Sequence, residues 1–196
     1  MTTDRRIRYE LGQLAEECAF KAVCKMLDSL LGVEPTVSTH SNGDKYATYI
    51  RNEEITGYPN EWTVAWIAPA KHHTYHKSAR DRPDIVVLCN EVAIVAIEVK
   101  NWDPASGQIS LHNVYVEMVR RFLGVPSGVI EIILSTSDNF ADRELCGRQL
   151  AEMGINFRLI HHRSLPNTDL EPTIDEMRHV LEEFITLKRL KEKEYG

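Results

Sequence analysis

The fold is decided by residues 85–100, which read IVVLCNEVAIVAIEVK. Two short runs rich in valine and isoleucine, 85–89 and 92–99, are separated only by Asn90 and Glu91. Runs of this composition with a short polar interruption are typical of two antiparallel strands joined by a tight turn. The stretch therefore predicts a β-hairpin at the centre of the protein.

The two faces of the second strand differ in polarity, because alternate side chains of a strand lie on opposite faces. One face is wholly apolar and comprises Ala93, Val95, Ile97 and Val99. The other comprises Ile94, Ala96, Glu98 and Lys100. Two charges at the end of an apolar strand are costly to bury unless water, a metal ion or a partner charge meets them.

An acid of the first strand, Asp84, is expected close to Glu98. A three-residue turn over 90–92 places the two acids directly opposite each other, with Cβ atoms ~5 Å apart, whereas a two-residue turn leaves them diagonal. Two carboxylates this close repel each other, and Lys100 alone does not offset both, but a divalent cation does. Oxygen ligands of this kind suit Mg²⁺ or Mn²⁺, which also bind phosphate.

The apolar periodicity on both sides of the hairpin predicts further helices and strands. The expected helices cover 5–31, 108–123, 139–153 and a final amphipathic segment opened by Pro172, with Ile174, Met177, Leu181, Phe184 and Ile185 facing inward. The expected strands cover 62–68, 129–134 and 155–160, and a short hairpin falls within 34–60. This order predicts an α/β fold with one central mixed sheet and helices on both faces.

The composition is that of a globular protein. The chain has 196 residues, 43% of them apolar and 27% charged, and a net charge of −6, which excludes a wholly basic nucleic-acid coat. One domain over 1–196 is expected, located in the cytoplasm, because the sequence shows neither a membrane-spanning apolar run nor a secretory leader. The four cysteines form no CxxC pair and are interpreted as reduced core residues.

The pair Pro83-Asp84, followed after thirteen residues by Glu98-Val99-Lys100, resembles the signature of the PD-(D/E)XK nucleases, the restriction-endonuclease-like superfamily. The resemblance covers about 5–135 and implies an αβββαβ core, with 136–196 as a C-terminal extension. It implies that Asp84, Glu98 and the carbonyl of Val99 hold Mg²⁺, or Mn²⁺ as a substitute. It also implies that Lys100 orients the attacking water.

A glutamate on the first helix is a further candidate by the same resemblance. Archaeal Holliday-junction resolvases of this superfamily carry Gly-x-x-x-Glu there, and Gly12 to Glu16 fits this pattern. The two residues lie one helical turn apart on one face. Glu10 and Glu17 are rival candidates.

The helix after the lysine carries Gln-x-x-x-Tyr in exonuclease members of the superfamily. Here Gln108 is followed by His112 at that spacing, so the motif is imperfect and an endonuclease is favoured. The resemblance implies a metal-dependent endonuclease that hydrolyses phosphodiester bonds in DNA, as a homodimer, since cutting two strands suits two-fold symmetry. The alternative is a nuclease-fold protein that binds nucleic acid, or acts as a scaffold, without cleaving.

A concentrated basic stretch, KHHTYHKSARDR, occupies 71–82. Its cations Lys71, Lys77, Arg80 and Arg82 are candidate phosphate contacts beside Asp84, and the alternative is a solvated connector. Its three histidines lack a cysteine pair at zinc-ligand spacing.

Aromatic residues offer one more candidate. Trp102, two residues after Lys100, is a candidate for stacking on bases, whereas Trp62 and Trp66 share one strand face and are expected in the core. The pair 161–162, two histidines at a strand end, is expected at the surface.

Overall fold

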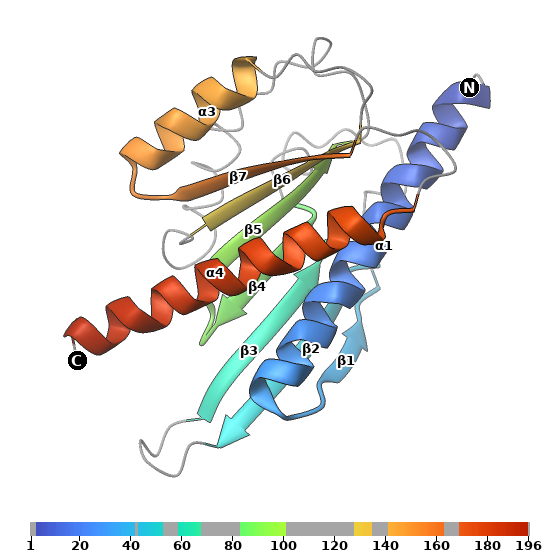
Figure 1. Ribbon diagram of the computed structural model, residues 1–196. Coiled ribbons are helices and arrows are strands. Elements are labelled where there is room, and N and C mark those ends of the chain that lie inside the picture. Colours follow the sequence, from blue (N-terminus) through green and yellow to red (C-terminus); the bar gives the residue numbers. More distant parts are fainter. Residues whose placement is uncertain are drawn as a thin grey trace.

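The computed structural model describes residues 3–41, 43–52, 59–67, 83–100, 128–134, 141–162 and 169–195. Within them the protein is an α/β fold with a seven-stranded mixed open sheet and three helices (Figure 1). The helices are α1 (Thr3–Leu31), α3 (Ala141–Glu152) and α4 (Glu171–Tyr195). The strands are β1 (Thr36–Thr39), β2 (Lys45–Asn52), β3 (Pro59–Trp66), β4 (Ile85–Cys89), β5 (Val92–Lys100), β6 (Gly128–Leu134) and β7 (Asn156–His162). The helix expected at 108–123 lies outside the described residues.

The strands are arranged in the order of the chain, from β1 to β7. The first five pair antiparallel, whereas β5, β6 and β7 run parallel to one another. The predicted mixed sheet is therefore confirmed, as are the central hairpin and the short hairpin within 34–60. Parallel neighbours need a crossover connection, and α3 provides it between β6 and β7.

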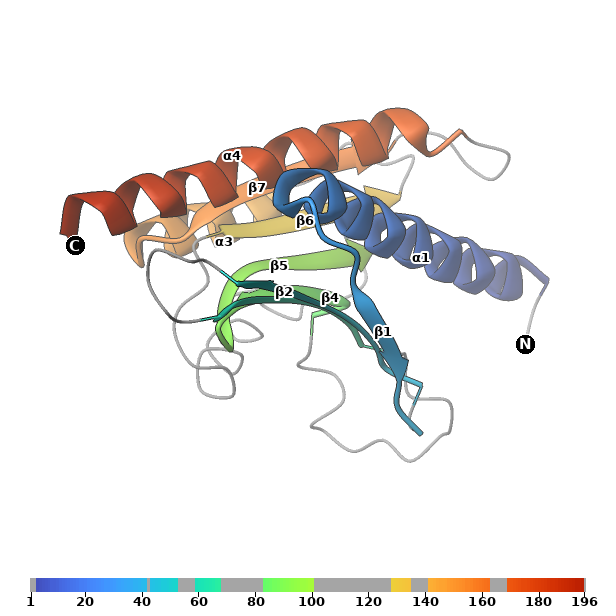
Figure 2. The same cartoon turned by 90° about the horizontal axis from the view of Figure 1, so that it is seen from below.

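Two helices, α1 and α4, pack side by side on one face of the sheet and bury the main core (Figure 2). Fully buried side chains from both helices and from the central strands meet there, among them Leu27, Ile97, Ile130, Leu181 and Phe184. The opposite face carries a smaller cluster, formed by Ala96, Val129, Leu150 of α3 and Ile155. Because α4 and α1 share one hydrophobic cluster, the C-terminal segment contributes directly to the core around the central hairpin.

Helix α1 is long, with 29 residues. It ends at Gly32, which has a φ of +66° and donates its N–H to the carbonyl of Asp28 (2.9 Å). Glycine adopts this left-handed conformation without steric cost, which explains the predicted stop. Neither α1 nor any other helix in the described part of the chain is long and apolar enough to cross a membrane.

The cysteines of the described side chains, Cys18, Cys24 and Cys89, are free thiols that are half-buried against the core. Burial raises the pKa of Cys24 to about 11. Since the thiolate is the reactive form of cysteine, this thiol is unreactive near neutral pH. For these three cysteines, the observations agree with the interpretation as reduced residues of the core.

Helix α4 begins next to Asp169, whose Oδ1 accepts a hydrogen bond from the N–H of Glu171 (3.0 Å). Such a side chain satisfies one of the backbone donors left open at a helix start. The five residues predicted to face inward are all buried. The predicted amphipathic helix is therefore confirmed, and Pro172 lies at its second position, where a missing N–H is tolerated.

The prediction of a surface histidine pair at 161–162 is wrong for His162. This residue is 7% exposed, and its Nδ1 lies 2.6 Å from the hydroxyl oxygen of Thr173 on α4. The helix covers the end of β7, and the sequence of the strand alone does not reveal this cover. Burial, and secondarily the charge of His161, lowers the pKa of His162, against an opposing effect of Asp169.

A pH dependence of stability follows from His162. Its pKa is lower in the folded protein than in the unfolded chain, so the unfolded chain binds the proton more tightly. The stability is fully present above the unfolded pKa of about 6.5 and declines as the pH falls from there through the folded pKa. We expect His162→Gln to reduce this decline, measured as the melting temperature between neutral and mildly acidic pH. The control is His179→Gln, at an exposed position of α4. Equal dependence of the melting temperature on pH for His162→Gln and wild type would contradict the prediction.

Candidate functional site

The turn of the central hairpin contains two residues, Asn90 and Glu91. Their φ values are +49° and +66°, and Cys89 pairs directly with Val92. Positive φ at both central residues is typical of the type I′ turn, whose twist matches that of the flanking strands. Of the two turn lengths considered from the sequence, the shorter is present.

A β-bulge then changes the register between the turn and the far end of the hairpin. Leu88 pairs with Ala93, but Val87 pairs with Val95, so Ile94 is the extra residue on β5. Ile94 packs in the main core together with its neighbour Val95, as expected when a bulge turns two consecutive side chains to one side. The prediction that Ile94 shares the face of Glu98 is therefore wrong.

Beyond the bulge, Ile85 pairs with Ile97. Asp84 and Glu98 are the next residues beyond this last pair of the ladder. From Val87 to Ile85, a two-residue turn and a bulge thus give the register that was expected from a three-residue turn. The two acids lie at the end of the hairpin opposite the turn.

The turn offers a test of this local geometry. Glu91 is exposed and holds a left-handed conformation that costs most L-residues about 1 kcal/mol or more. We expect Glu91→Gly to raise the free energy of unfolding by about 0.5–1 kcal/mol, measured by urea denaturation. Asn90→Gly is the matched comparison, and it is expected to lower the free energy of unfolding. It removes Asn90 Oδ1, which accepts a hydrogen bond from the N–H of Glu61 (3.0 Å). A destabilised Glu91→Gly protein would contradict the assignment of the turn.

Asp84 is held on both sides by backbone hydrogen bonds. Its Oδ2 accepts a hydrogen bond from the N–H of Val99 (2.7 Å), and its carbonyl accepts one from the N–H of Ile67 (2.8 Å). The residue is half-buried at the start of β4. The carboxylate is therefore fixed against β5 at the residue that follows Glu98.

Glu98 has an acidic neighbour that the sequence analysis missed. Glu131 of β6 pairs in register with Glu98 of β5, and the two are 0% and 5% exposed. In-register residues of neighbouring strands share a face of the sheet, so Glu98 and Glu131 lie side by side on one face. The alternation argument applied to Glu98 identifies Glu131 as well, since it is the only acid of the strand GVIEIIL.

Lys100 ends β5 and pairs through its backbone with Ile133 of β6. Its side chain lies outside the described part of the chain, so the role predicted for it stays a prediction. Val99, between the two charged residues, points its apolar side chain into the main core. Its backbone faces the carboxylate of Asp84.

Comparisons with protein-family models, with curated proteins and with solved structures give no significant match. The interpretation of this site therefore depends on its geometry and chemistry. The site consists of two acids, Asp84 and Glu98, and of the backbone N–H of Val99, which donates a hydrogen bond to Asp84.

Of the three candidate glutamates on α1, Glu16 is the one with a described contact to the sheet. Its Oε2 accepts a hydrogen bond from the indole N–H of Trp66 (3.2 Å). Trp66 pairs with Ile85, the residue next to Asp84, and packs on the α1 face of the sheet. The structure thus places Glu16 at the same end of the sheet as Glu98, but on the opposite face.

The rival glutamates differ in their surroundings. Glu17 forms an ion pair with Lys21 (3.0 Å), which lowers the pKa of Glu17 through its hydrogen bond and its charge. The side chain of Glu10 lies outside the described residues. Trp66 also has the ammonium group of Lys45 above its ring, 4.5 Å from the ring centre, and Trp62 is buried as expected.

The donor set at the hairpin end fits a hard divalent cation. Asp84 and Glu98 provide carboxylate oxygens and Val99 a backbone carbonyl, and Mg²⁺ is commonly bound by one or two carboxylates together with several waters. Among the residues that the structure describes, no group of three or more His, Cys, Asp or Glu side chains is arranged to hold a metal ion. Glu131 is therefore not assigned as a third ligand.

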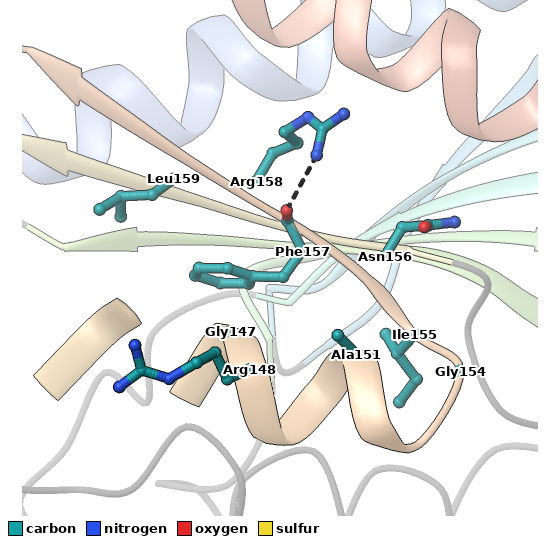
Figure 3. Close-up of a pocket in the computed structure, with 9 residues that line it drawn as sticks. All are labelled: Gly147, Arg148, Ala151, Gly154, Ile155, Asn156, Phe157, Arg158 and Leu159. Atoms are coloured by element: carbon teal, nitrogen blue, oxygen red, sulfur yellow. Dashed lines mark hydrogen bonds between the residues drawn. The ribbon is translucent and has the colours of Figure 1, made fainter. Parts of the chain in front are cut away.

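A pocket of about 650 Å³ lies between α3 and the edge strand β7 (Figure 3). Figure 3 shows Arg148 and Arg158 on opposite sides of β7, with Phe157 on the α3 side. Arg158 is bound to Glu183 of α4 (3.2 Å), so the two cations do not converge on one ligand position. Strand β6 separates this pocket from Glu98.

The other predicted site residues lie outside the described part of the chain. They are Gln108, the candidate DNA contacts Lys71, Lys77, Arg80 and Arg82, and Trp102. Their roles stay predictions.

Proposed function

We propose that this protein is a metal-dependent nuclease that hydrolyses phosphodiester bonds in DNA, with an endonucleolytic mode. The observation that carries the proposal is the hydrogen bond from the N–H of Val99, the residue after Glu98, to Oδ2 of Asp84 (2.7 Å) at the end of the β4–β5 hairpin. The register at this end depends on a bulge that a purely structural hairpin does not need. The position of the two acids coincides with the acid pair of the PD-(D/E)XK signature.

The order of the strands supports the finer assignment of the fold. An α-helix precedes an antiparallel meander of β3, β4 and β5, and the next strand, β6, runs parallel to β5. This agrees with an αβββαβ core of the restriction-endonuclease type, with the hairpin as its second and third strands. On this proposal β1, β2, β7 and α4 are additions around the core.

In the proposed mechanism, Asp84, Glu98 and the carbonyl of Val99 would hold Mg²⁺ or Mn²⁺. When bound, the ion polarises the phosphate and stabilises the leaving oxygen. Lys100 orients the attacking water, by resemblance to the superfamily. The Val99 amide fixes one oxygen of Asp84 and thereby sets the direction of the carboxylate.

The proposal is tested with purified protein and supercoiled plasmid, linear duplex, branched duplex and single-stranded DNA. We expect nicking of at least one substrate with Mg²⁺ or Mn²⁺, and none with EDTA. Glu91→Gln is a matched control, because this acid is exposed at the turn end of the same hairpin. Absence of metal-dependent cleavage on all four substrates would contradict the proposal.

The burial of Glu98, which is 5% exposed, favours a second candidate. This is a nuclease-fold protein that binds nucleic acid without cleaving it, because a buried carboxylate is poorly placed to meet a phosphate. The two candidates differ in the same assay. Retained DNA binding in a gel-shift experiment, together with no cleavage under any metal condition, supports the second.

A further inference from the structure

We propose that the pocket between α3 and β7 is a binding site for single-stranded DNA, which crosses the edge of the sheet there (Figure 3). The pocket measures about 650 Å³ and lies beside β7, the last strand of the sheet. Strand β6 separates it from Glu98, so it is distinct from the candidate metal site. Only the choice of DNA over RNA rests on the proposed function.

The charge of the pocket lining favours an anionic ligand. Two of the nine described residues that line the pocket are arginines, and none of the nine is acidic. The whole chain, in contrast, carries a net charge of −6. Arg148 of α3 and Arg158 of β7 are both exposed. A local excess of positive charge on an acidic protein attracts anions to that place.

Arg158 already has an acidic partner, but one that a phosphate can replace. Its ion pair with Glu183 joins two side chains that are 50% and 45% exposed. Such a surface pair contributes only about 0–1 kcal/mol. Arg158 also donates a hydrogen bond to the carbonyl oxygen of Phe157 (3.4 Å), which holds its guanidinium group beside the strand (Figure 3). The exchange of Glu183 for a phosphate therefore costs little.

The positions of the two arginines favour a polymer over a compact anion. Figure 3 shows Arg148 and Arg158 on opposite sides of β7. A compact anion reaches one of them, whereas a chain with a phosphate at every unit reaches both by crossing the edge of the sheet. Each arginine would then contact a different phosphate of one strand.

Phe157 favours an unpaired strand over a duplex. Its side chain lies on the α3 side of β7, as Arg148 does (Figure 3). It is partly exposed, and its ring lies against Gly147 of α3, where no Cβ intervenes. An accessible aromatic ring together with cations is the combination on which single-stranded nucleic acids bind, because every unpaired base has a face that stacks.

The experiment measures binding of a fluorescent oligothymidylate of about 10 nucleotides, a typical site size, by anisotropy. The full-length protein is used in EDTA at several salt concentrations. We expect Arg148→Gln and Arg158→Gln each to reduce the slope of log K against log salt by about 0.7, the value for one phosphate of a single strand. Phe157→Leu keeps an apolar side chain and is expected to weaken binding about 10-fold by loss of stacking, with the slope unchanged.

The matched control is Arg51→Gln, an exposed arginine of β2, which is expected to keep the affinity and the slope. Two competitors test the shape of the ligand. Thymidine monophosphate, a compact anion, is expected not to displace the oligonucleotide at equal phosphate concentration. A duplex of the same length is expected to bind more weakly, because its paired bases do not stack on Phe157. Displacement by the monophosphate, or equal affinity for the duplex, would contradict the proposed ligand.

The inference and the proposed function fail separately, because EDTA excludes metal-dependent cleavage from the binding assay. Wild-type affinity and salt slope in all three variants at positions 148, 157 and 158, with plasmid nicking by the wild type, would overturn the inference alone. The expected slopes without nicking of any substrate would overturn the nuclease and keep the binding site.

Discussion

Replacing Asp84 by asparagine is expected to slow Mg²⁺-dependent cleavage of DNA about 1000-fold, because a bound metal ion contributes several kcal/mol to charge stabilisation in the transition state. Asparagine keeps an oxygen that accepts the hydrogen bond from the Val99 N–H, so the fold is expected to be retained. We expect Mg²⁺ to raise the melting temperature of the wild type, and the variant to lose this rise. Initial rates of plasmid nicking and thermal melting with and without Mg²⁺ measure both effects.

Two further variants make this result specific. Lys100→Met is expected to lose cleavage and to keep the stabilisation by Mg²⁺, because the proposed role of Lys100 concerns water and not the metal. Glu91→Gln, at the other end of the hairpin, is expected to keep both the cleavage of DNA and the stabilisation by Mg²⁺. Cleavage by Asp84→Asn at the wild-type rate would remove Asp84 from the site.

The second large effect is expected from Gly128→Ala at the start of β6. A Cβ atom at this position would overlap the ring of Phe184 on α4, and this ring is 0% exposed. Because the strand and the ring are both buried, we expect the free energy of unfolding to fall by about 3 kcal/mol. Urea denaturation of the wild type and the variant measures the difference.

Gly147→Ala is the matched comparison. A Cβ at Gly147 would meet the ring of Phe157, but this ring is partly exposed and lines the pocket beside β7. It has room to turn, and alanine favours the helix by about 1 kcal/mol over glycine. We therefore expect Gly147→Ala to leave the free energy of unfolding nearly unchanged or to raise it slightly. In a double mutant, Phe184→Leu is expected to relieve most of the cost of Gly128→Ala, and strict additivity of the two changes would contradict the proposed clash.

Much of the fold is predictable because its strands are short and rich in β-branched residues. Residues 85–100 identify the hairpin, and the helical periodicity identifies α1, α3 and α4 near their observed bounds. The bulge, in contrast, could not be predicted from the sequence. Ile94 is apolar and suits either face of the strand, so only the packing of the complete core determines that it joins the α1 side.

The candidate site is predictable to a similar extent. The acids at 84 and 98 follow from alternation and spacing, but the register of the hairpin next to them depends on the bulge. The burial of His162 depends on the position of α4, which tertiary packing determines. Glu131 is visible as a lone acid in an apolar strand, and its pairing with Glu98 required knowledge that β5 and β6 are neighbours.

The bulge at Ile94 divides the central hairpin into two segments that can vary independently. A peptide tag inserted between Asn90 and Glu91 enlarges the loop and leaves the spacing of the acids unchanged. Deletion of Ile94 removes the extra residue and leaves the flanking pairs, Leu88 with Ala93 and Val87 with Val95, consecutive in a regular ladder. Natural variants and engineered fusions should therefore accept changes of length at the tip and the loss of the one extra residue at the bulge.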